Sequence, residues 1–63
     1  MCEANAYLLT DGREELIMES VDIVEPESDE TWRLVGIFGD RKTVKGRIKV
    51  MNLVDHKIVF EAK

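Results

Sequence analysis

Apolar and polar residues alternate along much of this chain, a pattern typical of strands that bury one face. The first such stretch runs from Ala4 to Leu9, and it would place Ala4, Ala6 and Leu8 on one face. Asp11-Gly12 follows at once, and this pair strongly favours a tight hairpin turn. We therefore expect the chain to open with a strand and a turn that reverses its direction.

The next segments continue the same alternation in shorter pieces. Glu15 to Met18 is expected to be extended and to pair back on the first strand. Val21 to Val24 is β-branched and predicts a further strand. Pro26 should end that strand or mark an edge, because proline cannot donate to a strand ladder. Glu27 to Glu30 then reads as an acidic turn.

The second half of the chain holds the longest apolar stretches. Thr31 to Phe38 predicts a strand with one face formed by Trp32, Leu34, Gly36 and Phe38. Its other face carries Val35 and Ile37, so both faces are apolar. Because a strand exposes one face unless something covers it, this segment predicts an additional contact surface.

The alternation is clearest from Val44 onward and changes partway along. In the stretch Val44 to Val54, the face shared by Val44, Gly46, Ile48 and Val50 opposes Lys45, Arg47 and Lys49. After Val50 the formerly charged face becomes apolar, with Met51 and Leu53. Asp55 to Lys57 predicts a turn, and Ile58 to Ala62 a closing strand with Ile58 and Phe60 inward.

No segment shows a sustained, capped helical period, so the pattern predicts an all-β domain. Short strands separated by turns favour a small SH3-like barrel of antiparallel strands, formed by residues 1–63 as a single domain. A chain of 63 residues with a single cysteine has a small core and no internal disulfide. Together with the apolar faces at 34–38 and 50–53, this predicts a homodimer.

Composition and charge narrow the class of partner. The chain is 44% hydrophobic, lacks a long apolar run and carries a net charge of −4. These features argue against disorder, a membrane span and nucleic-acid binding, and no secretory signal is visible. We expect a cytoplasmic protein. A basic cluster in the second half could still contact a partner, and it comprises Arg41, Lys42, Lys45, Arg47 and Lys49.

Cys2 is the residue most suggestive of chemistry, although a free cysteine is often only a small hydrophobic group. If the initiator methionine is removed, the α-amine and thiolate of Cys2 can chelate a metal ion together. Nitrogen and thiolate donors in a tetragonal arrangement favour Ni(II) or Cu(II), and a tetrahedral arrangement favours zinc. A homodimer would supply two such cysteines, and the backbone nitrogen of Glu3 could add a further donor.

Other chemistry finds less support. A Cys–His nucleophile would need a cleft and an orienting group, so we expect no enzymatic activity. His56 is a conceivable ligand but also an ordinary turn residue. The alternative to metal binding is a small protein- or RNA-binding module in which Cys2 is structural.

The sequence resembles the CooT family over essentially its whole length. The similarity is carried by the opening Met1 to Leu8, by Asp11-Gly12, by Met18 to Asp22, and by Gly46-Arg47-Ile48 and Leu53-Val54-Asp55. The resemblance implies a small homodimeric all-β protein that binds nickel through the second residue, here Cys2. It further implies a role as metallochaperone or accessory factor, with a nickel enzyme (carbon monoxide dehydrogenase) or its maturation ATPase as partner.

Overall fold

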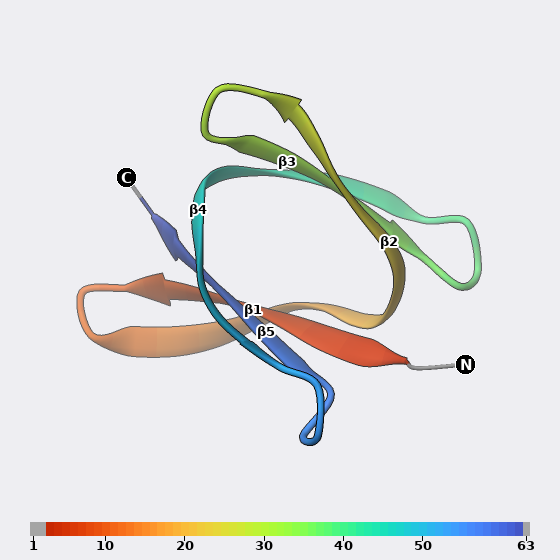
Figure 1. Cartoon of the computed structure of the whole chain (residues 1–63), viewed down its shortest axis with the longest axis horizontal. Helices are drawn as coiled ribbons and strands as arrows, with labels where there is room; N and C mark the ends of the chain where they lie inside the picture. The colour runs from red at the N-terminus through yellow and green to blue at the C-terminus, as the bar shows by residue number, and fades with distance from the viewer. Residues whose placement is uncertain (1–2, 63) are drawn as a thin grey trace.

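The computed structural model describes residues 3–62, and all of its regular structure is β (Figure 1). The strands are β1 (Ala4–Thr10), β2 (Arg13–Ser28), β3 (Thr31–Gly36), β4 (Arg41–Asn52) and β5 (Lys57–Ala62). Each strand pairs with the next in sequence, and β5 pairs with β1, so the strands form a closed ring. The prediction of an all-β fold is confirmed. No helix in the described part of the chain is long and apolar enough to cross a membrane.

The closing pair distinguishes this ring from a simple meander. The four pairs between consecutive strands are antiparallel, as predicted. The pair β1–β5 is parallel, with Tyr7 opposite Val59 and Leu8 opposite Phe60. Strand pairing therefore brings the first and last strands of the chain side by side, which the alternation pattern did not indicate.

The core lies inside the ring and receives side chains from every strand. Ala6, Leu34 and Phe60 are completely buried, and the rings of Trp32 and Phe60 pack at a centroid distance of 6.2 Å. The small side chains of Ala4 and Ala6 leave room for these larger groups. The inward positions predicted for Ile58 and Phe60 are confirmed, and Ala4, Ala6 and Leu8, which were predicted to share one face, all contribute to the core.

β2 is much longer than predicted, because the two strands expected at 15–18 and 21–24 are one strand of 16 residues. Its first half pairs with β1 and its second half with β3. The strand bends at Ser20, whose φ of 54° lies in the left-handed region. The bend is held by two hydrogen bonds, since the Ser20 amide donates to Asn5 Oδ1 (3.2 Å) and the Ile37 amide to the Ser20 carbonyl (3.0 Å). Pro26 lies within β2 beside a bulge rather than at its end.

Replacing Asn5 by alanine removes the acceptor that fixes this bend. We expect Asn5→Ala to lower the free energy of unfolding by about 1–2 kcal/mol, because the partly buried Ser20 amide loses its partner. Asn5→Asp keeps an oxygen in the same place and should retain most of the stability at neutral pH. Urea denaturation of both variants checks this, and equal losses would show that the acceptor oxygen is not what matters.

Two residues of the second half do not share the face predicted for them. Val50 is 44% exposed because a bulge between Ile48 and Val50 reverses the facing of β4, so that Val50 lies opposite Val59. Phe38 is 90% exposed because β3 ends at Gly36, and the aromatic ring belongs to the following turn. Both errors arise where the chain departs from regular strand geometry.

Candidate metal centre

The predicted ligand Cys2 lies outside the described residues, so the site is built from the residues around the start of β1. Glu3 immediately precedes β1 and is exposed. Ala4 is buried opposite Val21. The side chain at position 3 therefore faces solvent, whereas position 4 is fixed in the core. The backbone of Glu3 therefore leads directly into a strand whose first residue is fixed in the core.

The turn between β4 and β5 lies beside this entry point. The Asn5 amide donates to the carbonyl oxygen of His56 at 2.8 Å, and Asn5 lies opposite Lys57 in the parallel pair. His56 has a φ of 53° and an exposed side chain. Residues 3–5 and 55–57, which are far apart in sequence, are thus neighbours. The two candidate ligands Glu3 and His56 come to the same end of the molecule.

The described residues alone do not enclose a metal ion. Within residues 3–62, no three histidine, cysteine, aspartate or glutamate side chains lie close enough to share one. A site at this end would therefore need donors beyond these side chains, such as a thiolate or backbone nitrogens. His56 therefore lies near the start of β1 but does not belong to a preformed cluster of metal ligands.

Exposed apolar side chains accompany the entry point. Leu53 and Val54, in the turn that contains His56, are 64% and 88% exposed. Met51, at the end of β4, is also half exposed and lies opposite Ile58. An apolar surface therefore adjoins the start of β1. It agrees with the apolar face predicted at 50–53, and the homodimer stays a prediction.

Sequence analysis did not identify Asn5 as part of this end of the fold. Its amide and its side-chain oxygen hold the β4–β5 turn and the Ser20 bend, respectively. The only local signal was an asparagine in the middle of an otherwise apolar strand. Such a residue is unusual inside a strand and could have been recognised as one that makes specific hydrogen bonds.

Ion pairs occupy the outer surface of the ring. Lys57 Nζ donates to Glu14 Oε1 at 2.7 Å and lies 5.1 Å from the centre of the Tyr7 ring. The hydrogen bond to Glu14 is the main cause of a raised Lys57 pKa. The pKa of Arg33 is raised in the same way by its hydrogen bond to Glu25 (2.7 Å). These pairs hold the lysine and arginine side chains against the outer surface of the sheet.

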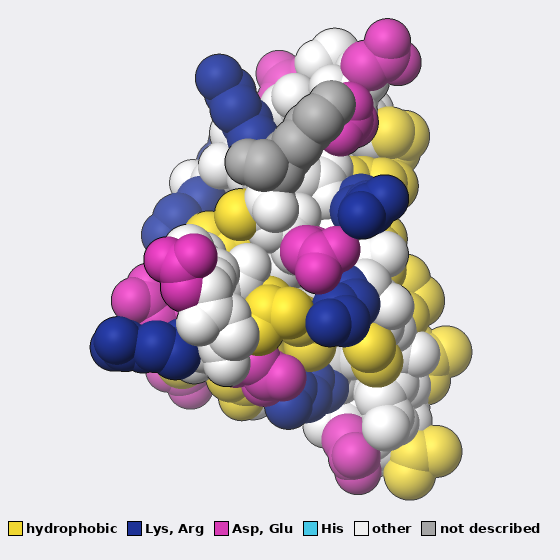
Figure 2. Space-filling model, turned by 90° about the vertical axis from the view of Figure 1, so that its left-hand side faces the viewer, with side chains coloured by type: hydrophobic (Ala, Val, Ile, Leu, Met, Phe, Trp, Pro, Cys, Tyr) yellow, Lys and Arg dark blue, Asp and Glu magenta, His cyan; other side chains and the backbone are white. Residues whose placement is uncertain are grey.

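Part of the predicted basic cluster is paired with acidic side chains. Arg47 and Lys49 both pair with Glu61, at 3.3 and 3.8 Å, and Lys42 reaches the carbonyl oxygen of Ile17 at 3.4 Å. On the face seen in Figure 2, basic and acidic side chains are interspersed. Such mixing lowers the local positive potential that a nucleic acid would require.

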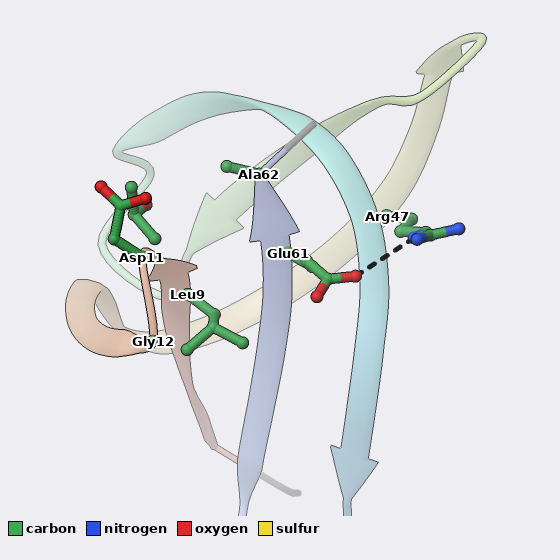
Figure 3. Close-up of a pocket in the computed structure, with 7 residues that line it drawn as sticks. Leu9, Asp11, Gly12, Arg47, Glu61 and Ala62 are labelled. Carbon is green, nitrogen blue, oxygen red and sulfur yellow. Dashed lines mark hydrogen bonds and ion pairs between the residues drawn. The ribbon is translucent and has the colours of Figure 1, made fainter.

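A hollow of about 590 Å³ lies at the opposite end of β1, beside the first hairpin (Figure 3). Leu9 and Gly12 line one side of it and the Arg47–Glu61 ion pair the other. The side chains that line it include no cysteine, serine or histidine. Its hydroxyl and carboxylate groups come from Thr10, Asp11 and Glu61, and it does not adjoin the candidate metal centre.

Known proteins resemble this chain in both fold and sequence. A crystal structure of a CooT from Carboxydothermus hydrogenoformans superimposes with a TM-score of 0.89 and is 44% identical in sequence, with 98% of each chain covered. An uncharacterized protein of Methanocaldococcus jannaschii is 39% identical over 61 residues, which are 97% of this chain and 98% of the relative.

The match to a protein family covers nearly the same span. The family described as the CO dehydrogenase accessory protein CooT matches residues 1–61. The resemblance seen in the sequence motifs is thus confirmed over almost the full length, from the Cys2 segment to β5. With a whole-chain family match and a CooT structure of the same fold, this chain belongs to the CooT family.

Proposed function

We propose that this protein is a homodimeric, cytoplasmic nickel-binding accessory protein that delivers or senses Ni(II) during maturation of a nickel enzyme. The observation that carries the proposal is the match of residues 1–61 to a family described as a CO dehydrogenase accessory protein. An accessory role also suits a ring of strands whose interior is filled by side chains. We propose an assisting rather than a catalytic function.

The chemistry of the N-terminal segment supports a thiolate site. Cys2 is the only cysteine in the sequence, and its thiolate is a donor that nickel accepts readily. The α-amine of Cys2, set free by removal of Met1, and the backbone nitrogen of Glu3 are the further donors that we propose, because nitrogen and thiolate donors suit a tetragonal Ni(II) site. Binding to these donors would release protons, so affinity should rise with pH.

One thiolate per chain is too few to hold an ion tightly, so we propose that two chains share it. Leu53 and Val54 lie in the turn beside the start of β1, where their exposed side chains could be buried by a second copy. An isologous contact there would bring both Cys2 segments to the two-fold axis. The proposed dimer, of two SH3-like domains, thereby places the metal at the interface.

The proposed client follows from the description of the family. Carbon monoxide dehydrogenase, or the ATPase that serves its maturation, is the partner we propose to accept the ion. The exposed position of Glu3 favours such a transfer, because a site at the edge of the fold is accessible to an incoming ligand. Nickel is here a cargo rather than a resident cofactor.

Nickel titration tests the proposal directly. Adding Ni(II) to the metal-free protein should produce thiolate-to-nickel charge-transfer absorption that saturates at one ion per two chains. A native mass spectrum of the loaded protein should show the same dimer with one ion. Saturation without charge-transfer absorption would mean that Cys2 is not a ligand, and the proposal would be wrong.

A further inference from the structure

The first half of β2 has a partner on only one of its edges. Residues 13–18 pair with β1, whereas the pairing with β3 begins at Val21. Among residues 3–62, no other strand lies against the second edge of this segment. An uncovered edge of this kind can accept an additional strand.

The hairpin geometry tells which backbone groups face the open edge. Thr10 and Arg13 flank the two-residue turn Asp11-Gly12, so they form a hydrogen-bonded pair. Hydrogen-bonded and non-hydrogen-bonded pairs alternate along an antiparallel ladder. Glu14 and Leu16 therefore direct their N–H and C=O groups away from β1. These groups are the donors and acceptors that an incoming strand would meet.

One side chain of the protein already uses this edge. Lys42, at the start of β4, extends its ammonium group to the carbonyl oxygen of Ile17 (3.4 Å). Ile17 lies at a bulge in β2, between the residues paired with Ala6 and Tyr7. The ammonium group therefore lies against a backbone carbonyl oxygen of this segment of β2. The edge is thus accessible to a cationic donor approaching from this side.

Apolar side chains form a groove along the same edge. A groove of about 470 Å³ is lined by Leu16, Ile17 and Met18 from β2 and by Phe38 from the β3–β4 turn. Leu16 is 48% exposed, and Phe38 is 90% exposed. An aromatic ring held at the surface beside an open edge can pack on alternate side chains of an added strand.

Carboxylates without an ion-pair partner near the groove favour a bound strand with basic side chains. Glu19 and Asp40 line the groove, and Glu15 lies in the same stretch of β2. None of the three takes part in an ion pair within the described part of the chain. A strand laid along this edge would meet negative charge close to its side chains. Lysine or arginine at alternate positions would satisfy that charge, whereas acidic residues would be repelled.

We propose that the open edge of β2, between Arg13 and Met18, binds an extended segment of a partner protein in which basic and apolar residues alternate. The backbone of the segment pairs with Glu14 and Leu16. Its apolar side chains pack on Leu16 and Phe38, and its basic side chains face the carboxylates. Arg13 lies at the other end of β1 from Glu3, and Glu14, Leu16 and Phe38 take no part in the proposed metal site, so the two proposals can be tested separately.

Hydrogen exchange with a synthetic peptide tests the pairing. The probe is a short capped peptide of alternating lysine and valine, added to the full-length protein and followed by amide exchange in nuclear magnetic resonance. The amides of Glu14 and Leu16 should become protected, whereas those of Arg13 and Glu15 already face β1 and should not change. A peptide N-methylated at every second amide, or one with glutamate in place of lysine, should not bind.

Matched variants of the protein locate the contact. Phe38→Ala should weaken peptide binding by at least about fivefold, whereas Ile23→Ala, at an exposed apolar position of β2 outside the groove, should change it by less than about twofold. Lys42→Ala removes the internal competitor and a repelling charge, so it should tighten binding by about threefold. Equal effects of Phe38→Ala and Ile23→Ala would contradict the proposed location.

Three further results would overturn the proposal. The first is no binding of the lysine–valine peptide at low salt. The second is binding without protection of the Glu14 and Leu16 amides, because the contact would then not be strand pairing. The third is protection of these amides in the free protein that grows with protein concentration, because a second copy of the chain would then occupy the edge.

Discussion

Gly46→Ala is expected to lower the free energy of unfolding by about 2–6 kcal/mol, a large share of the stability of so small a domain. Gly46 lies in β4 opposite Ala62, where β5 passes unusually close. A Cβ atom at this position would overlap the carbonyl oxygen of Glu61 and crowd the Cα atom of Ala62. The φ of Gly46 is 145°, a value that side-chain-bearing residues rarely adopt. The substitution therefore combines a backbone collision with conformational strain.

The surrounding hydrogen bonds prevent the strand from moving aside. The Gly46 amide donates to the carbonyl of Glu30 at 2.7 Å, and the Gly46 carbonyl accepts from Trp32 Nε1 at 3.2 Å. Shifting β4 away from β5 would disturb both bonds. Strain and overpacking of this kind each cost about 1–3 kcal/mol. A domain of 63 residues has only about 3–9 kcal/mol of stability in total.

Urea denaturation followed by Trp32 fluorescence and circular dichroism measures this loss. Gly39→Ala is the matched control, because Gly39 also has a positive φ (87°) but nothing lies within 4 Å of an added Cβ. It should cost only about 1–2 kcal/mol, from backbone strain alone. If Gly46→Ala were no more destabilising than Gly39→Ala, the close approach of β4 and β5 would not be as described.

The alternation of apolar residues was enough to predict the strands but not their continuity or facing. Regular alternation correctly predicted that Ile58 and Phe60 point inward, and both are buried. The pattern failed at Ser20, where a left-handed residue lets one strand turn a corner without ending, and at Val50, where a bulge exchanges the two faces. A bulge or bend shifts the alternation of the two faces, but the hydrophobicity of the sequence does not indicate where it occurs.

The candidate site was predictable in one respect only. A cysteine at the second position, together with the family motifs, pointed to Cys2 from the sequence alone. The nearness of the His56 turn to the start of β1 could not be predicted, because it depends on the parallel pairing of the first and last strands. Parallel strand pairs join residues that are far apart in sequence, and no short sequence motif predicts them.

Cys2→Ala is expected to reduce nickel affinity by more than about a hundredfold. Loss of groups that only support a metal ligand typically costs 10–100-fold in affinity, and loss of the ligand itself costs more. In the proposed dimer the substitution removes two thiolates from one ion. Cys2→Ser should also fail, because a neutral hydroxyl is a poor donor for nickel at neutral pH. Isothermal titration of Ni(II) into each metal-free protein measures the change.

Substitutions at the neighbouring positions distinguish the ligands. Glu3→Ala should leave nickel affinity nearly unchanged, because the donor proposed at this position is the backbone nitrogen and the side chain is exposed. His56→Ala distinguishes a thiolate site at Cys2 from a site in the β4–β5 turn. The His56 turn lies beside β1, but its imidazole belongs to no cluster of ligands among the described residues. An unchanged affinity is expected there. If Cys2→Ala bound nickel as tightly as the unaltered protein while His56→Ala did not, the metal would belong to the β4–β5 turn and the thiolate site would be wrong.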